Sequence, residues 1–223
     1  MTYLTRFHLD PRSRAGARYL TDPHRLHAAI YRAMPAQPVK VDEVGRPLWR
    51  LDRDDPRAPL LWVVSTERPN LDALADETGR SVEGTVYQSR DYSPLLDRLE
   101  EGQVYAFRLA GNAARSGRRS QEAKRTQRFG HVTPAQQIEW LMQKAEMYGF
   151  HVRPSMTGEA DVAVVGRRRT VFSRDGQRVV IAVAEFIGHL QVIDPNAMHK
   201  ALTAGIGHAR AYGCGLLTLA APR

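Results

Sequence analysis

The spacing of apolar residues along the chain predicts two successive units in which strands alternate with helices. In the first unit, short apolar runs predict four strands, at residues 3–9, 48–51, 60–65 and 84–89. Two helices lie among these strands, one with apolar residues at helical spacing from Leu26 to Ala33 and one over residues 71–77. Residues 10–17 are expected to form a basic connection. The order strand, helix, strand, strand, helix, strand is that of a ferredoxin-like unit.

The same order is expected in the remainder of the chain. Strands are predicted at residues 103–109, 150–153, 161–172, 178–193 and 215–220. Helices are predicted to begin at Thr133-Pro134 and Asp194-Pro195, because a capping side chain followed by proline favours a helix start. The first of these helices has an apolar stripe formed by Ile138, Leu141, Met142, Ala145 and Tyr148. The sequence therefore predicts an α+β fold of two tandem ferredoxin-like domains, residues 1–92 and 93–223, packed without a flexible linker.

The helix that follows Asp22 carries the titratable side chains of most interest. Asp22 suits its N-cap, and Pro23 suits its first helical position. At about 100° per residue, its polar residues fall on two flanks of the apolar stripe, with His24, His27 and Tyr31 on one and Arg25 and Arg32 on the other.

Three interpretations of His24 and His27 compete. A surface or capping role is the commonest one for a histidine in this place, whereas a metal pair would lack an obvious third ligand. In the third interpretation, a neutral imidazole takes the proton of a ribose 2′-OH as a general base. The RNA then supplies its own nucleophile, and the products are a 2′,3′-cyclic phosphate and a 5′-OH.

Composition narrows the class of partner. The 223 residues carry a formal net charge of +8, and 43% of them are hydrophobic, which is enough for a sizeable core. Such a charge favours polyanions, either nucleic acid or an acidic membrane surface. No apolar run approaches the roughly 18–20 residues that span a bilayer, and the N-terminus lacks a signal-peptide pattern. We therefore expect a cytoplasmic protein.

Two clusters of basic residues point to a phosphate backbone as the polyanion. The first holds six cations against one acid, Glu122, and consists of Arg115, Arg118, Arg119, Lys124, Arg125 and Arg128. The second flanks a hairpin signal, Asp175-Gly176, and consists of Arg167, Arg168, Arg169 and Arg174. A two-stranded ribbon of this kind suits a helical RNA. The alternative to RNA binding is that these residues simply form a solvated surface. For the second cluster this alternative carries the same weight as RNA binding.

A glycine-rich stretch near the C-terminus is expected to be a site for the RNA backbone. Glycine permits positive φ angles and close approach, and exposed amide groups in such a turn attract anions. The predicted site comprises Gly205, Gly207, His208, Arg210, Gly213 and Gly215. A dinucleotide-binding fold is rejected, because these glycines follow a helix and precede a strand, which is the reverse of that fingerprint.

Two further groups are interpreted as structural. Asp52, Asp54 and Asp55 resemble a metal-assisted nuclease site only by composition, because their neighbours are typical of a turn. Cys214, the single cysteine, excludes an internal disulfide and fits a reducing compartment. It lies between two glycines and is expected to pack rather than to act as a nucleophile.

Several stretches together resemble the CasE family, the CRISPR repeat-RNA endoribonucleases of type I-E Cascade. They are Tyr3–Arg14 (YLTRFHLDPRSR), Leu20–His27 (LTDPHRLH), Phe107–Asn112 (FRLAGN), Thr133–Leu141 and Gly205–Leu217 (GIGHARAYGCGLL). The resemblance covers the whole chain. The glycine-rich stretch alone would indicate only the wider RAMP superfamily.

This resemblance implies RAMP-type ferredoxin-like domains and metal-independent cleavage of precursor CRISPR RNA at the 3′ base of the repeat hairpin. It implies no cofactor, retention of the product crRNA, and assembly with the other Cascade subunits. His27 falls on the family's catalytic histidine, and His24 stands where the family often has a tyrosine. His24 could replace that tyrosine in positioning, take over part of the acid/base work, or have no role. Arg32 falls where a relative carries a cation that stabilises the developing charge, although helical spacing makes Tyr31 the better-placed neighbour of His27. The two basic clusters fall on regions that grip the RNA stem.

We therefore interpret the chain as an endoribonuclease that matures CRISPR RNA. A non-catalytic RNA-binding scaffold of the same superfamily is the competing hypothesis. A basic adaptor that binds only protein is the third, and the two separate arginine clusters disfavour it.

Overall fold

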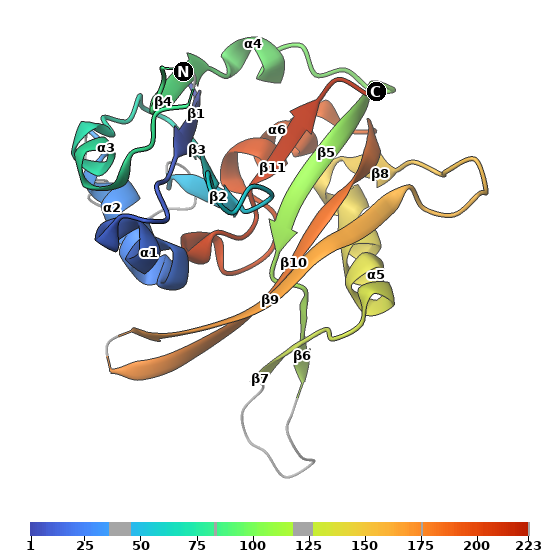
Figure 1. The fold of residues 1–223 in the computed structure, drawn as a ribbon. Helices are drawn as coiled ribbons and strands as arrows, with labels where there is room; N and C mark the ends of the chain where they lie inside the picture. The colour runs from blue at the N-terminus through green and yellow to red at the C-terminus, as the bar shows by residue number, and fades with distance from the viewer. Residues whose placement is uncertain (36–45, 83, 118–126, 175, 223) are drawn as a thin grey trace.

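The computed structural model describes residues 1–35, 46–82, 84–117, 127–174 and 176–222. Its strands form two main sheets with helices packed against them, and a small separate hairpin projects from the second sheet (Figure 1). In both sheets the strand order is that of a ferredoxin-like unit, with the first and third strands of the unit in the middle. No helix within the described ranges is long and apolar enough to cross a membrane.

The first sheet comprises β1 (Tyr3–His8), β2 (Leu48–Asp52), β3 (Leu60–Ser65) and β4 (Tyr87–Asp91), in the order β2-β3-β1-β4. Each strand is antiparallel to its neighbours. Helices α2 (Pro23–Arg32) and α3 (Asp72–Thr78) bury Leu26, Ile30 and Leu74 in a common core with Phe7 and Leu61 of the sheet. The four predicted strands are present, and only β4 begins later than expected.

Much of the predicted basic connection at residues 10–17 is in fact a helix, α1 (Arg14–Thr21). The side chain of Ser13 caps it by accepting a hydrogen bond from the amide of Gly16. A Cβ on Gly16 would lie 2.0 Å from the carbonyl oxygen of Asp10, so only glycine fits. The prediction was wrong because this helix buries only Gly16 and Tyr19, and two residues give no visible apolar periodicity.

The second sheet comprises β5 (Val104–Gly111), β8 (Phe150–Val152), β9 (Val162–Arg174), β10 (Gln177–Val192) and β11 (Leu217–Ala220). Its order is β11-β5-β10-β8, and β9 pairs with β10 beyond the end of β8. The remaining elements are α4 (Ser93–Leu96), β6 (Ala114–Gly117), β7 (Gln127–Gly130), α5 (Pro134–Ala145), η1 (Glu146–Tyr148), α6 (Pro195–Ala204) and η2 (Arg210–Tyr212).

Strands β9 and β10 form a long ribbon that extends past the sheet and runs beneath the N-terminal helices (Figure 1). Its register shifts between Glu185 and Phe186, where the ribbon departs from the body of the sheet. Helix α2 packs against both β9 and η2. The ribbon thus connects the second sheet with the helix that carries His27.

Helix α5 begins as predicted, with a complete capping box between Thr133 and Gln136. Its predicted stripe is partly wrong, because Met142 is 40% exposed and Trp140 is buried instead. The indole of Trp140 stacks on Phe186 with ring centroids 6.1 Å apart. A Cβ on Gly111 would lie 2.9 Å from the same indole, so this glycine makes room for it.

One apolar core crosses the junction between the two sheets. Leu48 and Val64 of the first sheet belong to the same buried cluster as Leu109 and Trp140 of the second half. The expectation of direct packing is therefore confirmed. The predicted domain boundary at residue 92 stays a prediction.

Candidate active site

Helix α2 positions His27 at the junction of the two halves. The carboxylate of Asp22 accepts hydrogen bonds from the amides of His24 and Arg25, and Pro23 occupies the first turn, so the predicted helix start is confirmed. Leu26, Ala29 and Ile30 are buried and fix the rotation of the helix. His27 is consequently half-buried, on the side of α2 that lies towards the ribbon.

The imidazole of His27 lies in a positively charged, partly apolar environment. The ring of Tyr31 meets it edge-on, with centroids 4.7 Å apart. Burial, and then the charges of Arg46, His24 and Arg174, lower the pKa of His27 to about 4. Its Nδ1 has no hydrogen-bond partner among the described residues. His27 is therefore a neutral imidazole at pH 7, which is the form that accepts a proton.

The glycine-rich loop and the arginine ribbon meet opposite this histidine. Arg174 donates a hydrogen bond from Nη1 to the hydroxyl of Tyr212 at 3.1 Å. The ring of Tyr212 packs on Phe172 of β9, with centroids 4.7 Å apart. Since η2 packs against α2, the structure brings together three segments that are far apart in the sequence.

His24 and Arg32 line a hollow on the side of α2 that faces α1 and α3. This hollow measures about 310 Å³ and is also lined by Arg18, Tyr19 and Glu77. The hydroxyl of Tyr19 donates to Glu77 Oε2 at 2.6 Å, and burial together with this bond raises the pKa of Tyr19 to about 12. As predicted, His27 and Arg32 lie on different flanks of α2. His24 was predicted to share the flank of His27, but it also lines the hollow beside Arg32.

Of the arginine ribbon, only part is available to a ligand. Arg167 and Arg169 are exposed, and Arg167 Nη1 donates to the carbonyl of Val132 at 3.1 Å. Arg168, between them, is half-buried and pairs with the carboxylate of Glu185. The two exposed arginines line a groove of about 830 Å³ between the ribbon and the β6–β7 hairpin.

The first basic cluster is only partly described. Arg115 is exposed on β6, and Arg128 belongs to β7. The others, Arg118, Arg119, Lys124 and Arg125, lie outside the described residues. The neighbours of these two arginines, Ala114 on β6 and Phe129 on β7, line the same groove as the ribbon.

The predicted anion-binding glycines serve mainly to pack the loop. Gly205 and Gly215 are buried, and their amides donate to the carbonyls of Ala201 and Ala110. The half-buried Gly207 donates to the hydroxyl of Tyr148 at 3.0 Å. Gly213 is buried with a φ of 80°, and a Cβ there would lie 2.6 Å from the ring of Trp49. Three of these four amides are therefore engaged within the protein, which argues against a backbone cradle for phosphate.

The polar side chains of this loop differ in exposure. Arg210 donates from Nη1 to the carbonyl of Ala204 at 2.7 Å and thereby covers the end of α6. His208 is exposed. Cys214 is buried, and burial raises the pKa of its thiol to about 12, in keeping with the predicted packing role.

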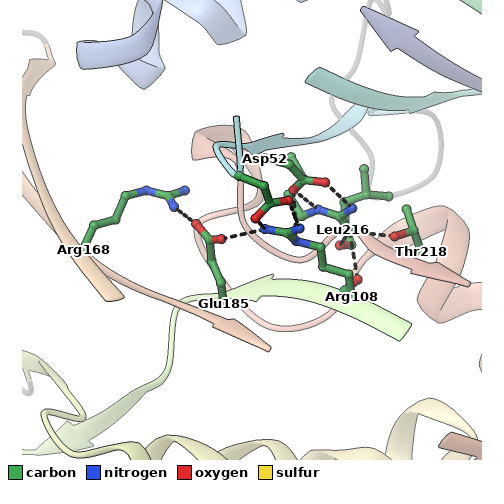
Figure 2. A network of polar contacts seen from close by, with 8 residues as sticks. Asp52, Arg108, Arg168, Glu185, Leu216 and Thr218 are labelled. Atoms are coloured by element: carbon green, nitrogen blue, oxygen red, sulfur yellow. Dashed lines mark hydrogen bonds and ion pairs between the residues drawn. The ribbon is translucent and has the colours of Figure 1, made fainter. Parts of the chain in front are cut away.

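A network of ion pairs and hydrogen bonds joins the two halves (Figure 2). The buried Arg50 donates to the carboxylate of Asp52 at 2.7 Å and to Thr218 Oγ1 and the carbonyl of Arg108 at 2.8 Å. Arg108 pairs with Asp52 and Asp54, and also with Glu185 at 3.1 Å. Burial by itself would lower the pKa of Arg108, but these carboxylates raise it.

The network bears out the structural interpretation of the three aspartates. Asp52 and Asp54 pair with arginines, and Asp55 Oδ1 accepts from the amide of Arg57 at 2.7 Å within the turn. In Figure 2, Glu185 lies between Arg108 and Arg168, so the network extends into the ribbon.

Sequence reasoning missed Arg46, Tyr212 and Glu185. Arg46 lies between the helix predicted to end near Ala33 and the strand predicted at residues 48–51, and no motif distinguishes it from the other arginines. Tyr212 lay within the glycine-rich stretch and was passed over for its neighbours. Glu185 interrupts the otherwise apolar run from Val179 to Gly188, and that interruption was the one available signal of a buried charge.

A sequence model described as CRISPR associated protein matches residues 2–221, nearly the whole chain. The chain belongs to the CRISPR associated protein family. Among its relatives in this family is the CRISPR-associated endoribonuclease Cse3 of Thermus thermophilus, which is 28% identical over 98% of this chain and 99% of its own. The CRISPR system Cascade subunit CasE of Escherichia coli is 27% identical over 89% of this chain and 92% of its own. The resemblance to the CasE family is thereby confirmed.

Solved structures of the family have the same fold. Thermus thermophilus Cse3 bound to an RNA representing a pre-cleavage complex is 28% identical, with a TM-score of 0.76 over 98% of both chains. A structure of CRISPR endoribonuclease Cse3 bound to a 19-nucleotide RNA gives a TM-score of 0.77 at 27% identity, over 99% of this chain and 100% of the other. The prediction of tandem ferredoxin-like domains of the RAMP type is confirmed.

Proposed function

We propose that this chain is an endoribonuclease that cleaves CRISPR precursor RNA at the 3′ base of the repeat hairpin. The observation that carries the proposal is the neutral, half-buried His27 on α2, beside Arg174 and Tyr212 at the junction of the two halves. The match over nearly the full length of relatives named as an endoribonuclease and a Cascade subunit supports the same reaction for this chain. Its setting would be the cytoplasm, with the product crRNA retained in Cascade.

In the proposed reaction His27 is the general base. The neutral ring accepts the proton of the 2′-OH, the 2′-oxygen attacks the adjacent phosphorus, and the bond from phosphorus to the 5′-oxygen breaks. We assign protonation of the departing 5′-oxygen to His24, because it lies roughly 60° from His27 on the same helix and is close enough for its charge to lower the pKa of His27. The products are a 2′,3′-cyclic phosphate and a 5′-OH. The charges of Arg46 and Arg174 would stabilise the additional negative charge on the phosphate.

Arginines on one side of His27 would hold the stem. Arg167 and Arg169 of the ribbon line the groove, and Arg174 of the ribbon and Arg115 of β6 are exposed, so an A-form stem could be bound here by its phosphates. Within the glycine-rich loop, the proposed RNA contact is restricted to His208 and Tyr212. Tyr31 would orient the imidazole of His27 by ring contact.

The decisive experiment is cleavage of a repeat hairpin in EDTA, with analysis of the product ends. We expect full activity without divalent ions, a 2′,3′-cyclic phosphate and a 5′-OH, and no cleavage when the nucleotide before the cut carries 2′-deoxyribose. A hairpin that is bound but never cut would instead identify a non-catalytic RNA-binding subunit. Cleavage that requires divalent ions would contradict the role of His27 as the base.

A further inference from the structure

The hollow beside His24 has a lining that suits an anion. Arg18 of α1 and Arg25 and Arg32 of α2 contribute three guanidinium groups, and Glu77 of α3 contributes one carboxylate. Arg25 is held in place by Asp22, at 3.1 Å from Nε to Oδ2. All three arginines are exposed, so the positive charge of the hollow is open to a ligand from solution.

The rotation of α2 relates this hollow to the proposed reaction. Around the helix, His24 lies roughly 60° from His27 and roughly 80° from Arg32, in opposite directions. His24 therefore separates two surfaces of the same helix. One surface, with His27, faces the ribbon and Tyr212, and the other, with Arg32, faces the hollow.

The direction of the reaction then assigns a different part of the RNA to each surface. The base, His27, acts on the 2′-OH, which belongs to the nucleotide that stays with the hairpin. The acid, His24, acts on the 5′-oxygen, which belongs to the strand that leaves. The leaving strand must start at His24 and continue away from the ribbon, towards Arg18, Arg25 and Arg32.

We propose that the hollow between α1, α2 and α3 is a subsite for phosphates of the single-stranded RNA on the 3′ side of the cut. The inference rests on the proposed function, because the roles of His27 as base and His24 as acid decide which RNA segment lies towards the hollow. The subsite would strengthen binding of the uncut precursor and would lose its ligand when the 3′ strand departs. The stem would stay bound by contacts on the other side of α2.

The test is a comparison of two RNAs, both with 2′-deoxyribose at the nucleotide before the cut so that neither is cleaved. One ends at the cut and the other carries about six further nucleotides on its 3′ side. The dissociation constants are measured for wild type, Arg18→Ala and Arg25→Ala at several salt concentrations. Arg98→Ala is the matched control, because Arg98 is also exposed but follows α4, which does not line the hollow and buries Leu96 in the core between the two sheets.

Wild type and Arg98→Ala should bind the extended RNA about three- to tenfold more tightly than the short one. The slope of log affinity against log salt should be steeper for the extended RNA by about 0.7 for each phosphate held. Arg18→Ala and Arg25→Ala should lose most of this gain while binding the short RNA like wild type. The inference is overturned if wild type shows no gain, or if Arg18→Ala keeps it. Cleavage of the unmodified hairpin, measured separately, tests the proposed function itself.

Discussion

At the scale of single residues, the chemistry of this protein depends on the neighbours of one histidine. Helical spacing alone placed His27 on a flank with Tyr31, and the observed ring contact agrees. The lowered pKa of His27 could not be predicted from the sequence, because it arises from burial and from Arg46 and Arg174, which other segments of the chain bring close. Local periodicity indicates where a side chain points but not which charges meet it.

Replacing Arg46 by glutamine should raise the pKa of His27, because a positive charge that disfavours the imidazolium is removed. A general base is active when deprotonated, so the acid limb of the kcat/KM profile of wild type should rise with pH through about 4. In Arg46→Gln this acid limb should move to higher pH. The measurement is a pH profile of kcat/KM, with Arg98→Gln as a control that leaves the limb in place. An unmoved or lowered limb in Arg46→Gln would contradict the electrostatic account.

Replacing His24 by alanine should slow cleavage of ordinary RNA by about 10²-fold or more, because the departing 5′-oxygen then lacks its acid. An RNA with sulfur in place of that 5′-oxygen has a better leaving group and needs no acid. On this substrate His24→Ala should cut nearly as fast as wild type, as measured by single-turnover kinetics. If the variant is equally impaired on both substrates, His24 acts in binding or positioning and not as the acid.

At the scale of elements, most local signals in the sequence were reliable. Helix starts at Pro23, Pro134 and Pro195 were predicted because capping chemistry is local, and so was the pairing of the two long strands. One failure was α1, which buries too few residues to show periodicity. The RNA contact expected of the glycine-rich loop stays a prediction, and three of its four glycine amides are engaged within the protein. Glycines that allow close packing look the same in sequence as glycines that cradle an anion.

Gly213→Ala tests the packing role of the loop. Positive φ alone should cost about 1–2 kcal/mol for a residue with a side chain. At Gly213 the new methyl group would also meet the ring of Trp49 at 2.6 Å, which should add about 1–3 kcal/mol of overpacking. Gly158→Ala is the matched control, because its φ is 85° but no atom lies within 4 Å of the new group. Urea unfolding should show a larger loss for Gly213→Ala, and equal losses would refute the contact with Trp49.

At the scale of the whole molecule, the two halves are joined by polar contacts as well as by an apolar core. Arg50 reaches from β2 to the carbonyls of Arg108 and Leu216 and to Thr218, all in the second half. Glu185 then links Arg108 with Arg168 of the ribbon. The order of elements in the sequence was enough to predict two ferredoxin-like units. The relative placement of the two units could not be predicted, because it depends on side chains that pair across long sequence separations.

Arg50→Ala should destabilise the protein by about 3–5 kcal/mol, because breaking a buried ion pair leaves its partners without compensation. Arg50 is 3% exposed, and its loss affects Asp52 and three acceptors in the second half. The free energy of unfolding in urea measures the effect. The exposed Arg98→Ala should change it by less than about 0.5 kcal/mol. A loss below about 1 kcal/mol for Arg50→Ala would show that the apolar core alone holds the halves together.

The central claim is that a neutral His27, held on α2 at the junction of the two halves, is the base that cuts the RNA. Its most direct test is single-turnover cleavage of a repeat hairpin in EDTA by His27→Ala, beside His199→Ala, which removes an exposed histidine from α6. We predict that His27→Ala loses at least about 10²- to 10⁴-fold in rate while its affinity for the hairpin stays within about threefold of wild type. His199→Ala should cut like wild type. Cleavage by His27→Ala within about tenfold of the wild-type rate would contradict the claim.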